Sequence, residues 1–150
     1  MFERFRARAS DRSGMTLLLV AFVVTLAVAA PATASSAAIV VPFEKHYDAS
    51  VGHYVGTAGQ DGTIAMWVYD SSYPGNVQQF TARLELSIGG NSLTAILDGR
   101  FNFSTGRVVL NGVVADGWLE GARIHEKSQL TGLDPLSFAG TVQLMPSSAD

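Results

Sequence analysis

The stretch that decides the fold runs from Val77 to Ile88 and reads VQQFTARLELSI. Apolar side chains occupy every second position from Phe80 to Ile88, and polar side chains fill the positions between them. Such strict alternation is typical of a β-strand with one face in a core and the other in water. The next residues, Gly89-Gly90-Asn91, tolerate the positive φ angles of a tight turn. We therefore predict a strand followed directly by a hairpin turn.

The same alternation, interrupted by glycine-rich turns, recurs on both sides of this stretch, and almost no segment after Ala38 carries a helical apolar stripe. About eight strands with short connections are expected. Their approximate ranges are 39–44, 51–57, 64–69, 77–88, 93–103, 108–114, 122–129 and 138–144. This order predicts an all-β fold in which each strand pairs antiparallel with the next.

A meander of this length exposes two strand edges unless the first and last strands pair, and closure removes both edges. Four glycines inside the predicted strands suit the sharp bends of a small barrel: Gly56, Gly99, Gly112 and Gly140. The preferred architecture is an antiparallel up-and-down barrel of about eight strands. A two-sheet β-sandwich is the alternative.

The N-terminal segment has the order of an export signal. Four arginines up to Arg12 precede an apolar run over 15–30, and Ala32-Thr33-Ala34 supplies an A-x-A cleavage site. We predict a helical signal peptide cleaved after Ala34, with Ala29 as a second cleavage candidate. An uncleaved membrane anchor is the alternative, although the run is shorter than the roughly 20 residues of a spanning helix. The predicted organisation is signal peptide 1–34, linker 35–38, barrel 39–146 and tail 147–150.

A cleavable signal peptide predicts a secreted or periplasmic location. The chain contains no cysteine, so neither disulfides nor thiol chemistry contribute. Without its leader the chain keeps six basic and eleven acidic residues, a net charge of −5 with no basic cluster. Phosphate backbones and anionic lipid surfaces both require clustered cations. We therefore expect neither nucleic acid nor a membrane surface as a partner of the mature chain.

Glycine-rich turns in the last third of the chain resemble those of short secreted bacterial proteins of unknown function, and more distantly those of calycin and allene-oxide-cyclase barrels. The resemblance rests on Thr105-Gly106, Leu110-Asn111-Gly112, Gly117-Trp118-Leu119-Glu120-Gly121-Ala122, Phe138-Ala139-Gly140-Thr141 and Met145-Pro146. It covers about the last 45 residues and implies a barrel fold. It implies no catalytic residue, because a fold does not fix a function.

One group of residues has the composition of a metal site. Glu44, His46 and Asp48 point to one side of an extended segment, and His53 is close enough in sequence to return beside them. Two imidazoles and two carboxylates can bind zinc or a similar ion. The alternative is a solvated polar face opposite Phe43, Lys45 and Tyr47.

Other residues suggest a ligand site. Glu126 shares its strand face with Ala122 and Ile124, which predicts an inward carboxylate, and buried carboxylates tend to mark sites. Trp67 and Tyr69 share one strand face, and Tyr54 and Trp118 are expected to join them in a stacked aromatic set. The alternatives place Glu126 at the barrel mouth and the aromatic rings in the core or over a barrel end.

Three classes of function are compatible with these features. The first is a binding module that takes a small apolar or aromatic molecule into its lumen or open end. The second is an envelope protein that binds another protein through its outer face or sheet edges. The third is an isomerase or cyclase in which Glu126 moves a proton. No nucleophile elbow or nucleotide motif is present in the sequence, so we predict no cofactor and favour a non-enzymatic role.

Overall fold

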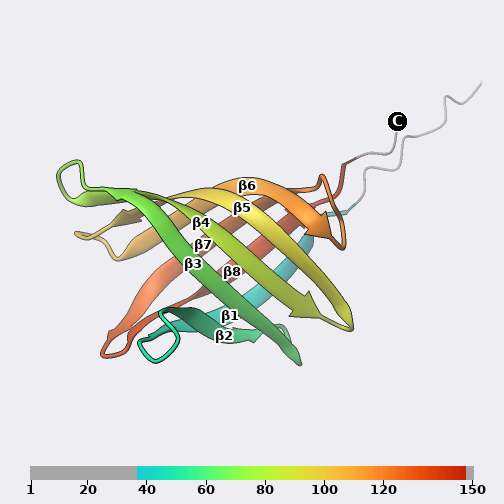
Figure 1. The fold of residues 1–150 in the computed structure, drawn as a ribbon, viewed down its shortest axis with the longest axis horizontal. Helices are drawn as coiled ribbons and strands as arrows, with labels where there is room; N and C mark the ends of the chain where they lie inside the picture. Colours follow the sequence, from blue (N-terminus) through green and yellow to red (C-terminus); the bar gives the residue numbers. More distant parts are fainter. Residues whose placement is uncertain (1–36, 148–150) are drawn as a thin grey trace, which may run out of the picture. The chain divides into compact units, whose positions relative to one another are not determined.

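The computed structural model describes residues 37–147, which form a closed antiparallel barrel of eight strands in simple sequential order (Figure 1). The strands are β1 (Ile39–Asp48), β2 (His53–Ala58), β3 (Gly62–Ser72), β4 (Val77–Ile88), β5 (Asn91–Asn102), β6 (Arg107–Gly117), β7 (Arg123–Leu133) and β8 (Leu136–Met145). The predicted up-and-down barrel is thus confirmed, and the sandwich alternative is excluded. The predicted signal peptide lies outside the described residues. Between 37 and 147 no helix is long and apolar enough to cross a membrane.

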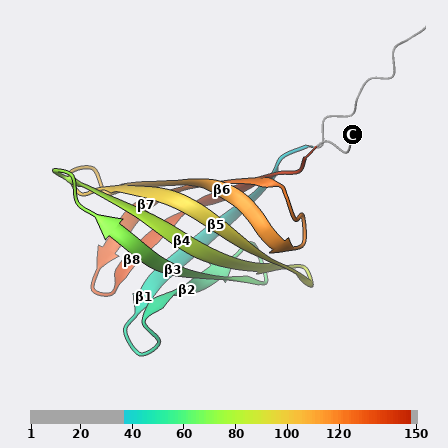
Figure 2. The same ribbon diagram turned by 45° about the horizontal axis from the view of Figure 1, so that its top comes forward.

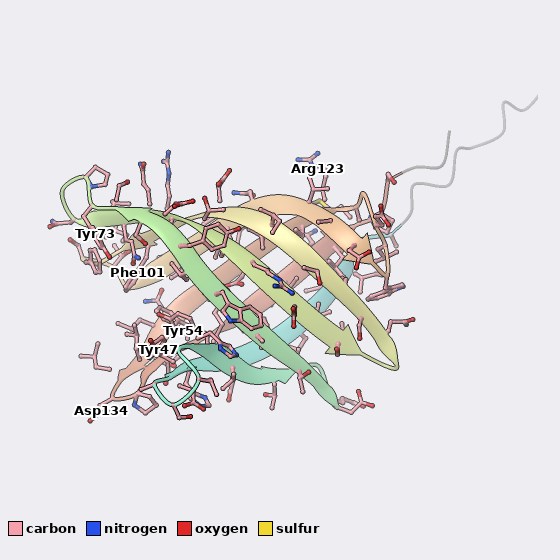
Figure 3. All side chains as sticks on the ribbon, in the orientation of Figure 1. Tyr47, Tyr54, Tyr73, Phe101, Arg123 and Asp134 are labelled. Carbon is pink, nitrogen blue, oxygen red and sulfur yellow. The ribbon has the colours of Figure 1, made fainter. Side chains whose placement is uncertain are left out.

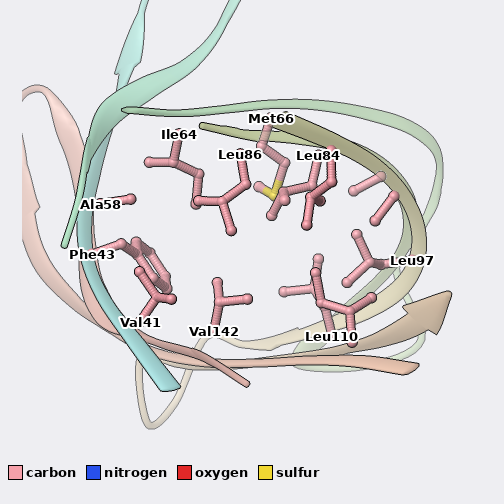
Figure 4. Packing of buried hydrophobic residues seen from close by; sticks show 14 of the residues in the cluster. Val41, Phe43, Ala58, Ile64, Met66, Leu84, Leu86, Leu97, Leu110 and Val142 are labelled. Carbon is pink, nitrogen blue, oxygen red and sulfur yellow. The ribbon is translucent and has the colours of Figure 1, made fainter. Parts of the chain in front are cut away.

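Strand β4 has the bounds and the faces that its sequence predicts. Ala82 and Leu84 point into the lumen and are buried, whereas Arg83 between them is exposed on the outer face. Along its full length β4 pairs with β5, from Val77 opposite Asn102 to Ile88 opposite Asn91. Inward side chains from all walls of the barrel meet in one apolar core (Figure 4). The hydrophobic effect of that burial is the main stabilising term available to a domain without disulfides.

Closure of the barrel comes from β1, which pairs with β2 on one side and with β8 on the other. The β1–β8 ladder runs from Ile39 opposite Leu144 to His46 opposite Ser137. Every strand in the described barrel therefore has two neighbours. The short β2 pairs only with Gly62–Met66 of β3, so the rest of β3 has a ladder partner on the β4 side alone.

Three strand glycines allow the backbones of neighbouring strands to approach closely. A Cβ atom built at Gly140 would lie 1.9 Å from the backbone oxygen of Lys127, and Gly56 and Gly112 meet similar backbone contacts. At Gly99 the added atom would meet the ring of Phe80 instead, at 2.5 Å. These four positions therefore have no room for a side chain, and their predicted role in bending the sheet stays a prediction.

Sequential up-and-down connections place alternate loops at opposite ends of the barrel (Figures 1 and 2). Loops 49–52, 73–76, 103–106 and 134–135 share one end, which we call the cavity end. Loops 59–61, 89–90 and 118–122 share the other, which we call the terminal end because β1 begins and β8 ends there. The two ends differ in packing, and that difference locates the candidate site.

Candidate ligand-binding site at one end of the barrel

A cavity of about 160 Å³ lies inside the cavity end of the barrel. Its lining comes from β1, β2, β3, β4, β5, β6 and β8, and consists of Lys45, Tyr47, Tyr54, Met66, Val68, Gln78, Phe80, Phe101, Val108 and Phe138. The lumen towards the terminal end is filled instead by aliphatic side chains such as Ile64, Leu86 and Leu144. The barrel therefore has one packed half and one half with space for a small molecule.

Aromatic rings form a continuous series across the cavity end. The centroids of Tyr47 and Tyr54 are 5.4 Å apart, Tyr54 lies 5.9 Å from Phe138, and Phe138 lies 5.4 Å from Phe101. All three pairs have the edge-to-face geometry that aromatic quadrupoles favour. Figure 3 shows Tyr47, Tyr54, Phe101 and Tyr73 gathered at this end of the barrel, away from Arg123. The walls can thus offer ring faces and edges to a flat guest.

Beneath this aromatic zone lies a buried ion pair. The Nζ atom of Lys45 donates to Oε1 of Glu126 at 2.5 Å, and the two side chains are 1% and 0% exposed. Lys45 also contacts Met66 Sδ at 3.2 Å, and its Nζ atom lies 4.9 Å from the ring centre of Phe43. Ser128 Oγ donates to the same carboxylate oxygen at 3.2 Å, while Oε2 of Glu126 has no hydrogen-bond partner. The floor of the cavity is therefore polar and incompletely satisfied.

The position of each charge follows from strand alternation. Lys45 lies between the inward residues Phe43 and Tyr47 on β1, and Glu126 lies between the inward residues Ile124 and Ser128 on β7. Burial lowers the pKa of Lys45, and the opposing attraction and hydrogen bond of Glu126 do not fully compensate. The attraction of Glu126 therefore offsets only part of the free-energy cost of burying the charged ammonium.

The inward orientation predicted for Glu126 is confirmed, and Tyr54 also lines the cavity. The other aromatic residues of the predicted set lie elsewhere. Trp67 is on the outer face, where its ring stacks on His53 with centroids 4.3 Å apart, and Tyr69 is exposed on the same face. Trp118 lies in loop 118–122, partly buried against the core at the terminal end. The four aromatic residues do not form one site.

The predicted metal ligands are not brought together. Within residues 37–147 no group of three or more His, Cys, Asp or Glu side chains is arranged to hold a metal ion, so the structure does not assemble the predicted site. Glu44, His46 and Asp48 follow one strand face, where alternate residues are about 7 Å apart. Asp48 accepts hydrogen bonds from Ser50, which lower the pKa of its carboxyl, and His53 is held against Trp67.

A larger hollow of about 660 Å³ lies on the outer wall around β3 to β6. It is open to solvent, and polar side chains within it already pair across strands, as Thr81 Oγ1 does with Asp98 Oδ1 at 3.3 Å. Beside it, Asn111 and His125 are hydrogen-bonded at 2.5 Å. Ligand sites bury most of a small guest, so we assign the candidate site to the smaller internal cavity.

No protein-family model, curated protein or solved structure matches this chain. The resemblance to calycin-type barrels stays a prediction. The candidate site therefore rests on the geometry of the cavity end and of the ion pair beneath it.

Proposed function

We propose that this protein is an exported binding protein that holds one single-ring aromatic molecule, or an apolar molecule of similar size, in its cavity end. The observation that carries the proposal is the cavity itself, about 160 Å³ of space with aromatic walls in an otherwise filled barrel. An engineered apolar cavity of about 150 Å³ in another protein is known to hold benzene. The same volume is too small for drug-sized ligands, whose pockets span about 300–1,000 Å³.

Apolar side chains around the mouth support the same proposal. Each of four loops or strand ends at the cavity end carries one exposed large hydrophobic residue: Val51, Tyr73, Phe103 and Leu133. The loops at the terminal end carry no exposed residue of this kind, and the strand ends there carry one, Val40 at the start of β1. Apolar surface that gathers at one place often marks a binding site. The rings of Tyr73 and Phe103 stack with centroids 6.4 Å apart, so part of this apolar surface is continuous at the end that holds the cavity.

The competing functions have less support. Glu126 is paired with Lys45 and is not part of the cavity lining, which does not favour direct proton transfer to a bound substrate. On the outer wall, a protein-interaction role would have Ile96 and Val113 as an exposed cross-strand pair. That pair is small compared with a stable protein interface.

The test is a titration with benzyl alcohol, followed by the chemical shifts of the lining residues in NMR spectra. We expect a dissociation constant between about 1 μM and 1 mM, the range that a ligand of this size can reach. Val68→Trp fills the cavity and should abolish binding, whereas Val113→Trp adds the same ring to the outer face and should leave binding unchanged. Shifts confined to the outer wall, or equal binding to both variants, would contradict the proposal.

A further inference from the structure

A binding role for the cavity does not explain the ion pair beneath it. An apolar ring needs only apolar walls, yet β1 and β7 each place a charged side chain in the lumen. Replacement of a buried pair by apolar residues is often neutral or stabilising. The pair is therefore better explained by chemistry than by stability.

Lys45 is the member of the pair that reaches the cavity, because its side chain is part of the lining whereas Glu126 lies behind it. Its Nζ atom has one strong acceptor, Glu126 Oε1, and one weak acceptor, Met66 Sδ. An ammonium has three protons to donate, so this one is under-solvated. Its side chain is desolvated against Met66 and the ring of Phe43, and desolvation in an apolar surrounding is a setting in which lysine side chains become nucleophilic. Glu126 is in direct contact and can accept the proton that the amine must lose.

We propose that Lys45 captures the carbonyl carbon of a small aromatic aldehyde as an imine, with Glu126 as the proton acceptor and counter-ion. This inference rests on the proposed function, since the aromatic walls must first bind the ring. Burial lowers the pKa of Lys45, which is the direction that favours the neutral amine.

The reaction balances without any oxidant or reductant. Lys45 Nζ passes a proton to Glu126, and its lone pair then forms a C–N bond to the carbonyl carbon. The carbonyl oxygen gains the proton and, after a second proton transfer, leaves as water while the C=N bond forms. The product is one imine and one water from one aldehyde and one amine.

Charge balance in the lumen favours this product. A protonated imine carries the same positive charge as the ammonium that it replaces, at the same nitrogen. Glu126, whose side chain is 0% exposed to solvent, therefore keeps a charged partner. A single aromatic ring fits the volume of about 160 Å³, and an aldehyde adds the smallest carbonyl substituent. Aromatic rings on β1, β2, β5 and β8 would surround the guest.

The chain provides its own control, because its sequence contains only two lysines, Lys45 and Lys127. Lys127 is exposed on the outer face of β7. The experiment incubates the wild-type protein with benzaldehyde and sodium cyanoborohydride at neutral pH, and maps the benzylated lysines by peptide mass spectrometry. We expect Lys45 to be labelled at least about tenfold faster than Lys127, because the cavity holds the aldehyde beside the Lys45 side chain that lines it. Equal labelling, or labelling of Lys127 alone, would overturn the proposal.

Two further measurements separate this inference from the binding function. Val68→Trp should block labelling of Lys45 and leave labelling of Lys127 unchanged, which shows that the aldehyde enters through the cavity. Excess benzyl alcohol, which binds without a carbonyl, should slow labelling of Lys45 alone. If benzyl alcohol binds to the cavity and Lys45 is still not labelled, the imine is refuted and the binding function stands. If benzyl alcohol does not bind, the binding function itself fails.

Discussion

Removal of one partner from the buried ion pair should destabilise the barrel far more than removal of both. In Lys45→Met, the carboxylate of Glu126 keeps only the hydrogen bond from Ser128 at 3.2 Å, and its Oε2 atom stays without a partner. An uncompensated buried charge of this kind costs about 3–5 kcal/mol. In Glu126→Leu, the ammonium of Lys45 keeps only Met66 Sδ, so a loss of the same size is expected.

The double variant Lys45→Met/Glu126→Leu should instead have wild-type stability or exceed it by up to about 4 kcal/mol, because it removes both desolvation costs. A domain of this size has a total stability of roughly 5–15 kcal/mol. The single variants should therefore be close to unfolding, while the double variant folds well. This contrast gives a coupling free energy of several kcal/mol between the two positions.

Urea unfolding followed by the fluorescence of Trp67 and Trp118 measures these differences. With a urea dependence of about 1–3 kcal/mol per molar, each single variant should shift the midpoint down by about 2 M. Glu85→Gln is the matched control, since Glu85 forms an ion pair with Arg83 that is 42–51% exposed, and its loss should cost less than about 1 kcal/mol. A double variant as unstable as the sum of the two singles would refute the desolvation argument.

Three more predictions follow from the same structure. Gly140→Ala should lower the free energy of unfolding in urea by at least about 2 kcal/mol, because the added Cβ would clash with the carbonyl oxygen of Lys127. Gly75→Ala is the control: its Cβ would meet open space, and only its φ of +62° disfavours alanine, so it should lower that free energy by only about 1 kcal/mol. The pKa of Lys45 in the folded chain lies below its ordinary value of 10.5, so the unfolded chain binds more protons at pH values between the two. The free energy of unfolding of the wild type, relative to that of the double variant, should therefore rise as the pH increases towards 10.5. A difference that falls over this range would contradict the direction of the pKa shift. Phe138→Ala should enlarge the cavity, cost about 3–5 kcal/mol and allow naphthalene to bind in NMR titrations, unless the site collapses and excludes it.

The fold was predictable because its decisive signal is local. Alternation in β4 shows which side chains enter the core, and short glycine turns leave sequential antiparallel pairing as the simplest arrangement. Closure followed from the same pattern, since an open meander would expose its edges. None of these inferences requires knowledge of which distant residues meet.

The site was predictable only in part, because it depends on which strand ends share one end of the barrel. Alternation places Glu126 inside, but the partner of its carboxylate lies 81 positions earlier in the chain. Lys45 lies two residues after the inward Phe43, so strand alternation indicates that its side chain also points inward. This alternation is the only signal in the sequence for the ion pair. The aromatic walls were missed for the same reason, since Phe101 and Phe138 approach each other only after the barrel closes.

Strand β2 gives the barrel uneven resistance to local opening. It has six residues, compared with ten to twelve in every other strand, and it therefore contributes the fewest backbone hydrogen bonds to its two ladders. Local opening free energies are lowest where such bonds are few, so amide hydrogens of β2 should exchange with solvent before those of β4 and β5. Tyr54 belongs to this strand and lines the cavity. Fluctuations of β2 would then control how fast a guest enters or leaves, separately from the contacts that hold it inside.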